Sequence, residues 1–87
     1  MKFDFVKNIQ FTKLIKINGQ LREFNFRKSN ATHEGFFSVD VSDDRGNRIM
    51  FSMEVKDGQW IIMTPGLPKW VSEQEAVFSN IIVEEMK

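Results

Sequence analysis

The side chains that could carry out acid–base chemistry are few in this chain. There is one histidine, His33, followed by Glu34, and there is no cysteine or tyrosine. A His–Glu pair can act as a base with a carboxylate that orients it, but adjacent side chains in an extended segment point apart. The segment Ser29 to Glu34 is also expected to connect two strands. This pattern favours the interpretation of His33 as a solvated loop residue. We therefore expect no catalytic residue and no enzyme activity.

Several carboxylates occur in pairs that could hold a metal ion or transfer protons. Asp43 and Asp44 are adjacent in an expected turn, where Asp is favoured, and they lack the alternating oxygen ligands of a calcium loop. Glu84 and Glu85 lie near the end of an expected helix, where they are more simply solvated charges. No glycine-rich phosphate-binding loop precedes that helix. We therefore expect no metal site and no cofactor.

One set of side chains combines aromatic rings with positive charge. On one face of an expected strand, cations alternate with phenylalanines, and a lysine lies across from the first ring. Proteins that bind single-stranded nucleic acid use such surfaces, because bases stack on rings and phosphates contact Lys or Arg. The neighbouring strand offers apolar side chains, so the same pattern also fits a core face. Single-stranded nucleic-acid binding is thus the alternative function, with these residues: Lys13, Arg22, Phe24, Phe26 and Lys28.

Glycine-containing turns define most of the expected strands. Asn18-Gly19 is the favoured pair for a two-residue type I′ hairpin, because both central residues need positive φ. The turn sets Ile17 opposite Gln20, and the register along both strands follows from that pair. The register places these apolar side chains on one face: Phe11, Ile15, Ile17, Phe24 and Phe26.

A second turn region allows two registers, and the hydrophobic pattern chooses between them. A four-residue closure would pair Val39 with Met50, whereas a three-residue loop, Asp44-Arg45-Gly46, pairs Val39 with Phe51. We predict the three-residue loop, because it aligns apolar residues and gives Gly46 the left-handed conformation of a G1 bulge. A third turn, at Asp57-Gly58, sets Val55 opposite Trp60 by the rule used for Asn18-Gly19.

The sheet is expected to end at the segment 65–68, Pro-Gly-Leu-Pro, because proline lacks the donor that a ladder needs. The segment Ser72 to Glu75 then fits a capping box, with Ser72 as the N-cap. A helix is predicted from about residue 73 to 86, and it is too short to be stable without docking on the sheet. Its apolar stripe consists of Val77, Phe78, Ile81 and Ile82.

The predicted fold class is α+β, a largely antiparallel five-stranded β-meander with one C-terminal amphipathic helix packed on one face. We expect a single domain over residues 1–87. The order of the last four strands and the helix is similar to the ββββα repeat of Pur-type nucleic-acid-binding proteins, a similarity of element order that carries no site residue. The helix is expected to cover the face with these side chains: Phe37, Val39, Val41, Ile49, Phe51, Met53, Val55, Trp60 and Ile62.

The opposite face is predicted to be more apolar than a solvated sheet face usually is, since it carries Phe36, Met50, Ile61 and Met63. We expect the N-terminal hairpin, the segment 3–6 with its two phenylalanines, or another protein chain to cover it. Our first hypothesis is therefore a small non-enzymatic interaction module that acts through this face or an edge strand. Its partner would be another protein or a second copy in a homodimer.

Charge is balanced over the whole chain but not along it. The sequence has 12 basic and 12 acidic residues. Residues 1–28 hold seven basic and two acidic side chains, a net +5, and residues 29–87 hold five and ten, a net −5. The two halves either neutralise each other, which we favour, or leave a basic end for a partner. No apolar run has the length of a signal peptide or a membrane span, so we expect a cytoplasmic protein without membrane contact.

Overall fold

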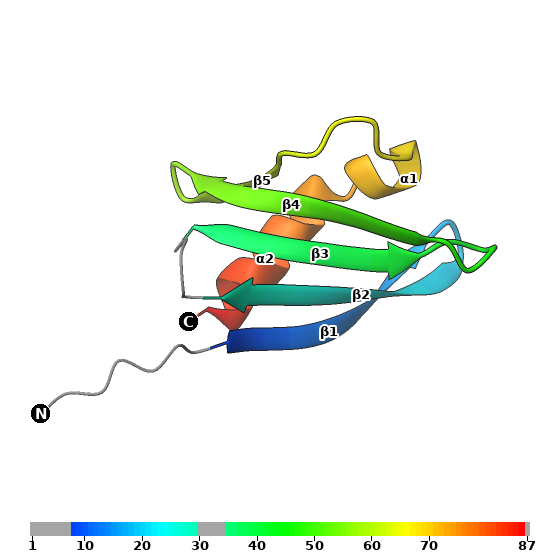
Figure 1. The fold of residues 1–87 in the computed structure, drawn as a ribbon, viewed down its shortest axis with the longest axis horizontal. Helices are drawn as coiled ribbons and strands as arrows, with labels where there is room; N and C mark the ends of the chain where they lie inside the picture. The colour runs from blue at the N-terminus through cyan, green and yellow to red at the C-terminus, as the bar shows by residue number, and fades with distance from the viewer. Residues whose placement is uncertain (1–7, 30–34, 87) are drawn as a thin grey trace, which may run out of the picture.

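The computed structural model describes residues 8–29 and 35–86, and it confirms the predicted α+β meander (Figure 1). Five strands form one antiparallel sheet in the order β1-β2-β3-β4-β5, and two helices follow them. His33 and the segment 3–6 lie outside the described residues. The elements are β1 (Asn8–Ile17), β2 (Gln20–Ser29), β3 (Phe36–Ser42), β4 (Arg48–Lys56), β5 (Gln59–Ile62), α1 (Lys69–Ser72) and α2 (Glu75–Glu85).

The three glycine turns set the registers that the sequence predicts. Asn18 and Gly19 have φ of 52° and 82°, and Ile17 lies opposite Gln20. Gly46 has φ of 83°, a value that strains residues with a Cβ, and Val39 lies opposite Phe51 as the three-residue loop requires. The β4–β5 turn likewise places Val55 opposite Trp60. The predicted hairpin registers are therefore confirmed.

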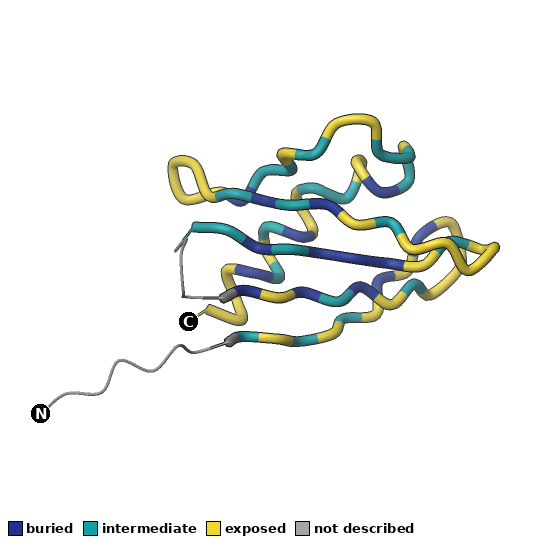
Figure 2. The backbone as a smooth tube through the Cα atoms, viewed as in Figure 1, coloured by how far each residue is buried: buried dark blue, intermediate teal, exposed yellow. Residues whose placement is uncertain are grey.

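The core lies between the sheet and α2. We call the sheet face toward the helices the inner face. Phe78 of α2 is fully buried, and its ring centroid lies 5.0 Å from that of Phe24 and 5.4 Å from that of Phe51. One helical side chain thus contacts β2 and β4, and burial alternates along the strands beneath it (Figure 2). The buried core consists of Ile15, Ile17, Phe24, Phe26, Phe37, Val39, Val41, Phe51, Met53, Trp60, Val71, Phe78 and Ile82.

The predicted start of the helix is wrong. Ser72 is the last residue of α1, which begins after Pro68, and neither helix has a side-chain N-cap hydrogen bond. Val71, in α1, is fully buried, so packing holds the residues before Ser72 in helical conformation. The Oε2 atom of Glu75 accepts a hydrogen bond of 2.7 Å from the amide of Ile62 in β5. A tertiary contact therefore occupies the carboxylate that the capping box assigned to the helix start.

Ion pairs join the basic beginning of the chain to the acidic remainder. Lys13 Nζ lies 2.9 Å from Glu85 Oε2, and Arg22 Nη1 lies 2.9 Å from Asp44 Oδ1. A third pair links Arg27 to Asp40 at 3.5 Å. These contacts support the interpretation that the two halves of the chain neutralise each other.

Candidate functional site

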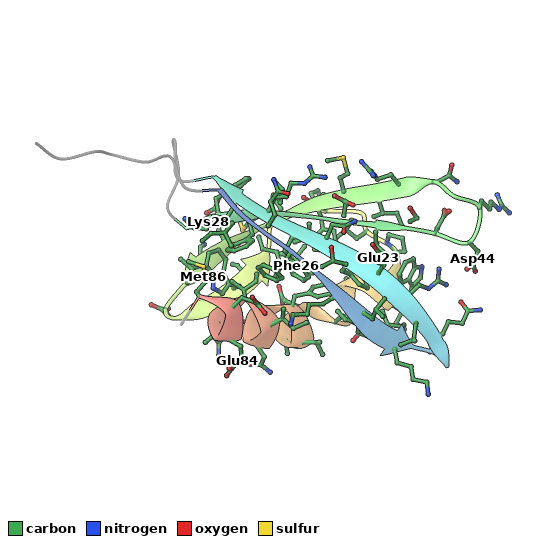
Figure 3. The ribbon with its side chains drawn as sticks, turned by 90° about the horizontal axis from the view of Figure 1, so that it is seen from below. Glu23, Phe26, Lys28, Asp44, Glu84 and Met86 are labelled. Atoms are coloured by element: carbon green, nitrogen blue, oxygen red, sulfur yellow. The ribbon has the colours of Figure 1, made fainter. Side chains whose placement is uncertain are left out.

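The sheet face away from the helices, here called the outer face, carries the predicted interaction residues. Both helices lie on the other side of the sheet (Figure 3). Phe36 and Ile61 each lie opposite Glu54, and Met50 lies opposite Asp40. Residue 63 continues the alternation beyond β5, since the Met63 amide donates to the Ser52 carbonyl at 2.8 Å. The structure thus brings all four predicted residues to β3–β5 and the segment after it.

The exposure of these four side chains is uneven. Met50 is 56% exposed and Met63 is 42% exposed, whereas Phe36 and Ile61 are half-buried. Polar side chains separate them, because Ser52 lies in the strand between Met50 and Glu54. The apolar atoms therefore form a mixed surface with polar groups between them, which is the usual composition of a non-obligate protein interface.

A polar network crosses the same face from β1 to β3. The Thr12 hydroxyl donates to Asn25 Oδ1 at 2.7 Å, and Asn25 Nδ2 donates to Asp40 Oδ1 at 3.0 Å. The guanidinium groups of Arg27 and Arg48 lie 3.5 and 3.8 Å from the Asp40 carboxylate. Asp40 is only 3% exposed, although no described helix lies over this face. Its partners offset the cost of burying a carboxylate.

Sequence reasoning missed this network. Its signal was present, because Thr12 is opposite Asn25 and Asn25 is opposite Asp40. The first pairing followed from the Asn18-Gly19 turn, but the β2–β3 register did not follow from any tight turn. Without that register, Asp40 could not be aligned with Asn25.

The alternative nucleic-acid residues lie on the inner face, and the structure does not offer them as a stacking platform. Phe24 and Phe26 are both 0% exposed. Phe26 stacks on Phe11 with centroids 4.8 Å apart, and its ring also lies 6.1 Å from Phe78. A base could not reach either ring without displacing α2. The phenylalanines of β2 therefore belong to the core, which is the other interpretation that the sequence allowed.

The cations of that set are also engaged. Lys13 pairs with Glu85, as described above, and Lys28 is 5% exposed. Arg22 pairs with Asp44, and its guanidinium carbon lies 4.6 Å from the ring centroid of Trp70. This geometry is a cation–π contact, which links α1 to the beginning of β2. Lys13 and Arg22 therefore serve the packing of the helices and loops, and Lys28 is buried.

The loop between β3 and β4 is organised by one carboxylate. Asp43 Oδ1 accepts hydrogen bonds from the amides of Arg45 and Asn47, at 2.9 and 2.8 Å. Desolvation raises the pKa of Asp43, but these bonds, the Asn47 side chain and the charge of Arg45 outweigh it and lower the pKa below 3.8. These donors thus stabilise the ionised form of Asp43, which links the two ends of the loop.

Within residues 8–29 and 35–86, no three His, Asp or Glu side chains gather as a metal site would require. In the same part of the chain, neither helix has the length and apolarity needed to cross a bilayer. Comparison with known proteins found no matching family model, no matching curated protein and no matching solved structure. Any function must therefore be argued from the surfaces themselves.

Proposed function

We propose that this chain is a small non-enzymatic interaction module, acting in the cytoplasm, that binds another protein through its outer face. The observation that supports this proposal is the position of Met50 and Met63, two exposed methionines on a face over which no described helix lies. Methionine adapts its shape to a partner, and its thioether gains favourable contacts with aromatic rings. The half-buried Phe36 and Ile61 extend this apolar surface along the strands.

The composition of the surrounding surface also supports a protein partner. On the outer face Arg48 lies two positions before Met50 in β4, and Arg27 approaches Asp40, the residue opposite Met50; the two arginine side chains are about half exposed, at 58% and 48%. Methionine, arginine and aromatic residues are enriched at protein interfaces relative to other surface. Both guanidinium groups lie within 4 Å of the Asp40 carboxylate, and their exposed parts are available to acidic or aromatic groups of a partner.

Single-stranded nucleic-acid binding through β2 would need accessible rings, whereas Phe24 and Phe26 are fully buried beneath α2. Its prediction of salt-weakened binding to an oligonucleotide would require α2 to undock first.

Site-specific cross-linking tests the outer face. A photoreactive amino acid would replace Met63 in one version of the chain and Val77 in another, in cells that naturally express the protein. Val77 is a matched control, because it is 38% exposed but lies on α2. We expect a discrete adduct from position 63 and none from position 77. No adduct at position 63, or the same adducts from both positions, would overturn the proposal.

Solution size covers the case in which the partner is a second copy. If the outer faces bind each other, the wild-type mass exceeds 10.2 kDa, and both Met63→Glu and Ile61→Glu restore the monomer. Val77→Glu adds the same charge on α2 and should leave the mass unchanged. Each variant should retain the fold by circular dichroism.

A further inference from the structure

The two edges of the sheet differ in how their outward backbone groups are satisfied. In β5, the edge strand nearest α2, the Trp60 amide donates to Ser79 Oγ at 2.9 Å and the Ile62 amide donates to Glu75 Oε2 at 2.7 Å. Both acceptors belong to α2. The helix therefore caps this edge, which is one of the ways in which proteins prevent an edge strand from pairing with another chain.

No described helix caps the opposite edge, β1, in this way. In a two-residue hairpin the pair beside the turn is hydrogen-bonded, so Ile17 and every second residue before it bond to β2. The alternate residues direct their amides and carbonyls away from the sheet. Among residues 8–29 and 35–86, no side chain or loop donates to or accepts from the backbone of Gln10, Thr12, Leu14 or Lys16.

The strand is also regular enough to accept a neighbour. Its register with β2 runs without interruption from Asn8 to Ile17, and it contains no proline and no bulge. An unpaired edge of this length is a template for β-strand addition.

We propose that β1 pairs with β1 of a second copy of this chain, antiparallel and with the two-fold axis at Thr12, so that two five-stranded sheets become one. The proposal does not depend on the outer face binding a protein. It concerns the backbone of β1, whereas the proposed function concerns side chains of β3–β5.

The side-chain pairs of this register favour a second copy. On the outer face, Thr12 faces its symmetry mate, a pair that can hydrogen-bond across strands, and Gln10 faces Leu14 of the second copy. On the inner face, Phe11 faces Lys13 of the second copy, and no two like charges are opposite each other. A two-fold axis at Lys13 would instead oppose two ammonium groups, and an axis at Leu14 would shorten the paired region. The axis at Thr12 pairs residues 8–16, a length of about 30 Å.

The lysine that points inward from this edge does not prevent pairing. An inward charge on an edge strand usually opposes association, but Lys13 Nζ is already 2.9 Å from Glu85 Oε2 of its own α2. The border of the core at this edge is also incompletely covered, since Ile9 and Phe11 are only half-buried. In the proposed register Ile9 faces Ile15 of the second copy and Phe11 faces Lys13 of the second copy, so pairing removes part of this border from water.

Sedimentation of the full chain tests the proposal through the backbone of one residue. We expect the mass to rise with concentration from 10.2 kDa toward twice that value. Leu14→Pro removes an outward backbone amide that does not bond to β2, at a residue that is 63% exposed. The loss of this donor should weaken association by roughly tenfold or more. Leu14→Thr keeps the amide and should associate as the wild type does. Leu21→Lys, at a 65% exposed position on β2, controls for side-chain change on the same face.

Amide hydrogen exchange provides a second measurement that does not depend on any variant. The amides of Gln10, Thr12, Leu14 and Lys16 should exchange more slowly as concentration rises, while those of Phe11 and Ile15, already bonded to β2, should change little. A chain that stays at 10.2 kDa, or outward amides that exchange fast at every concentration, would overturn the proposal. A dimer that survives Leu14→Pro but is split by Met63→Glu would also overturn it, and would place the contact on the outer face instead.

Discussion

Asn25 and Phe26 are neighbours in β2, and their side chains enter opposite environments. Phe26 points into the core, where aromatic rings from β1 and α2 surround it. Asn25 points to the outer face, where it links the hydroxyl of Thr12 to the carboxylate of Asp40. Burial is nearly complete at Asp40 as well as at Phe26, at 3% and 0% exposure. Among the described residues, burial on the inner face comes from packed rings, whereas burial at Asp40 is accompanied by a hydrogen bond from Asn25 and ion pairs with Arg27 and Arg48.

The two faces should respond differently to the loss of one side chain. The inner face depends on shape, so removing atoms leaves a cavity. The outer face depends on matched donors and acceptors, so removing one group leaves its partners without a bond.

The largest expected effect is on the inner face, at the ring that spans two strands. Phe78→Ala should lower the free energy of unfolding by about 3–5 kcal/mol, because the ring is fully buried against Phe24, Phe26 and Phe51. Urea denaturation followed by tryptophan fluorescence measures the change. Val77→Ala, at the preceding and 38% exposed position, is the control and should cost well under 1 kcal/mol. Similar losses for the two variants would contradict the position of α2 over the sheet.

A smaller effect is expected on the outer face, at Asp40. Asp40→Ala should lower the free energy of unfolding by about 1–3 kcal/mol, because the Asn25 amide group loses its acceptor in a site with little water. Asp40→Asn keeps an acceptor oxygen and should cost less than about 1 kcal/mol, since Arg27 and Arg48 are half exposed and pair weakly. The same denaturation experiment measures both. If Asp40→Asn proved as costly as Asp40→Ala, charge and not hydrogen bonding would hold this face together.

The parts of the fold that the sequence predicted are those fixed by local chemistry. Positive φ at Asn18, Gly19 and Gly46 selects the turn, and the turn selects the register of both strands. Alternation then assigns each side chain to a face, which is why the predicted positions of Met50 and Met63 agree with the structure. No knowledge of distant contacts was needed for these steps.

The parts that failed or remained open depend on contacts between distant segments. The helix start was misplaced because Glu75 bonds to Ile62 in β5 and Val71 packs in the core, and neither contact leaves a local pattern. The role of the β2 phenylalanines remained open because the reach of α2 across the sheet cannot be read from periodicity. Phe78 contacts Phe24 only because the helix crosses from β5 toward β1.

The smallest expected effect concerns Asp43. Its loop sets the β3–β4 register, and this register determines which residues of the two strands lie on each face. The pKa of Asp43 is lowered in the folded chain, so below the unfolded value of about 3.8 the unfolded state binds more protons. This contribution to stability is complete above that value and is lost as pH falls through the folded pKa. Urea midpoints measured from about pH 6 to about pH 2 should therefore fall less steeply for Asp43→Asn than for the wild type. The side chain introduced by Asp43→Asn does not titrate in this range, so the difference between the two curves isolates the Asp43 carboxyl. Equal slopes would show that the hydrogen bonds from Arg45 and Asn47 persist in the unfolded chain or do not form in the folded one.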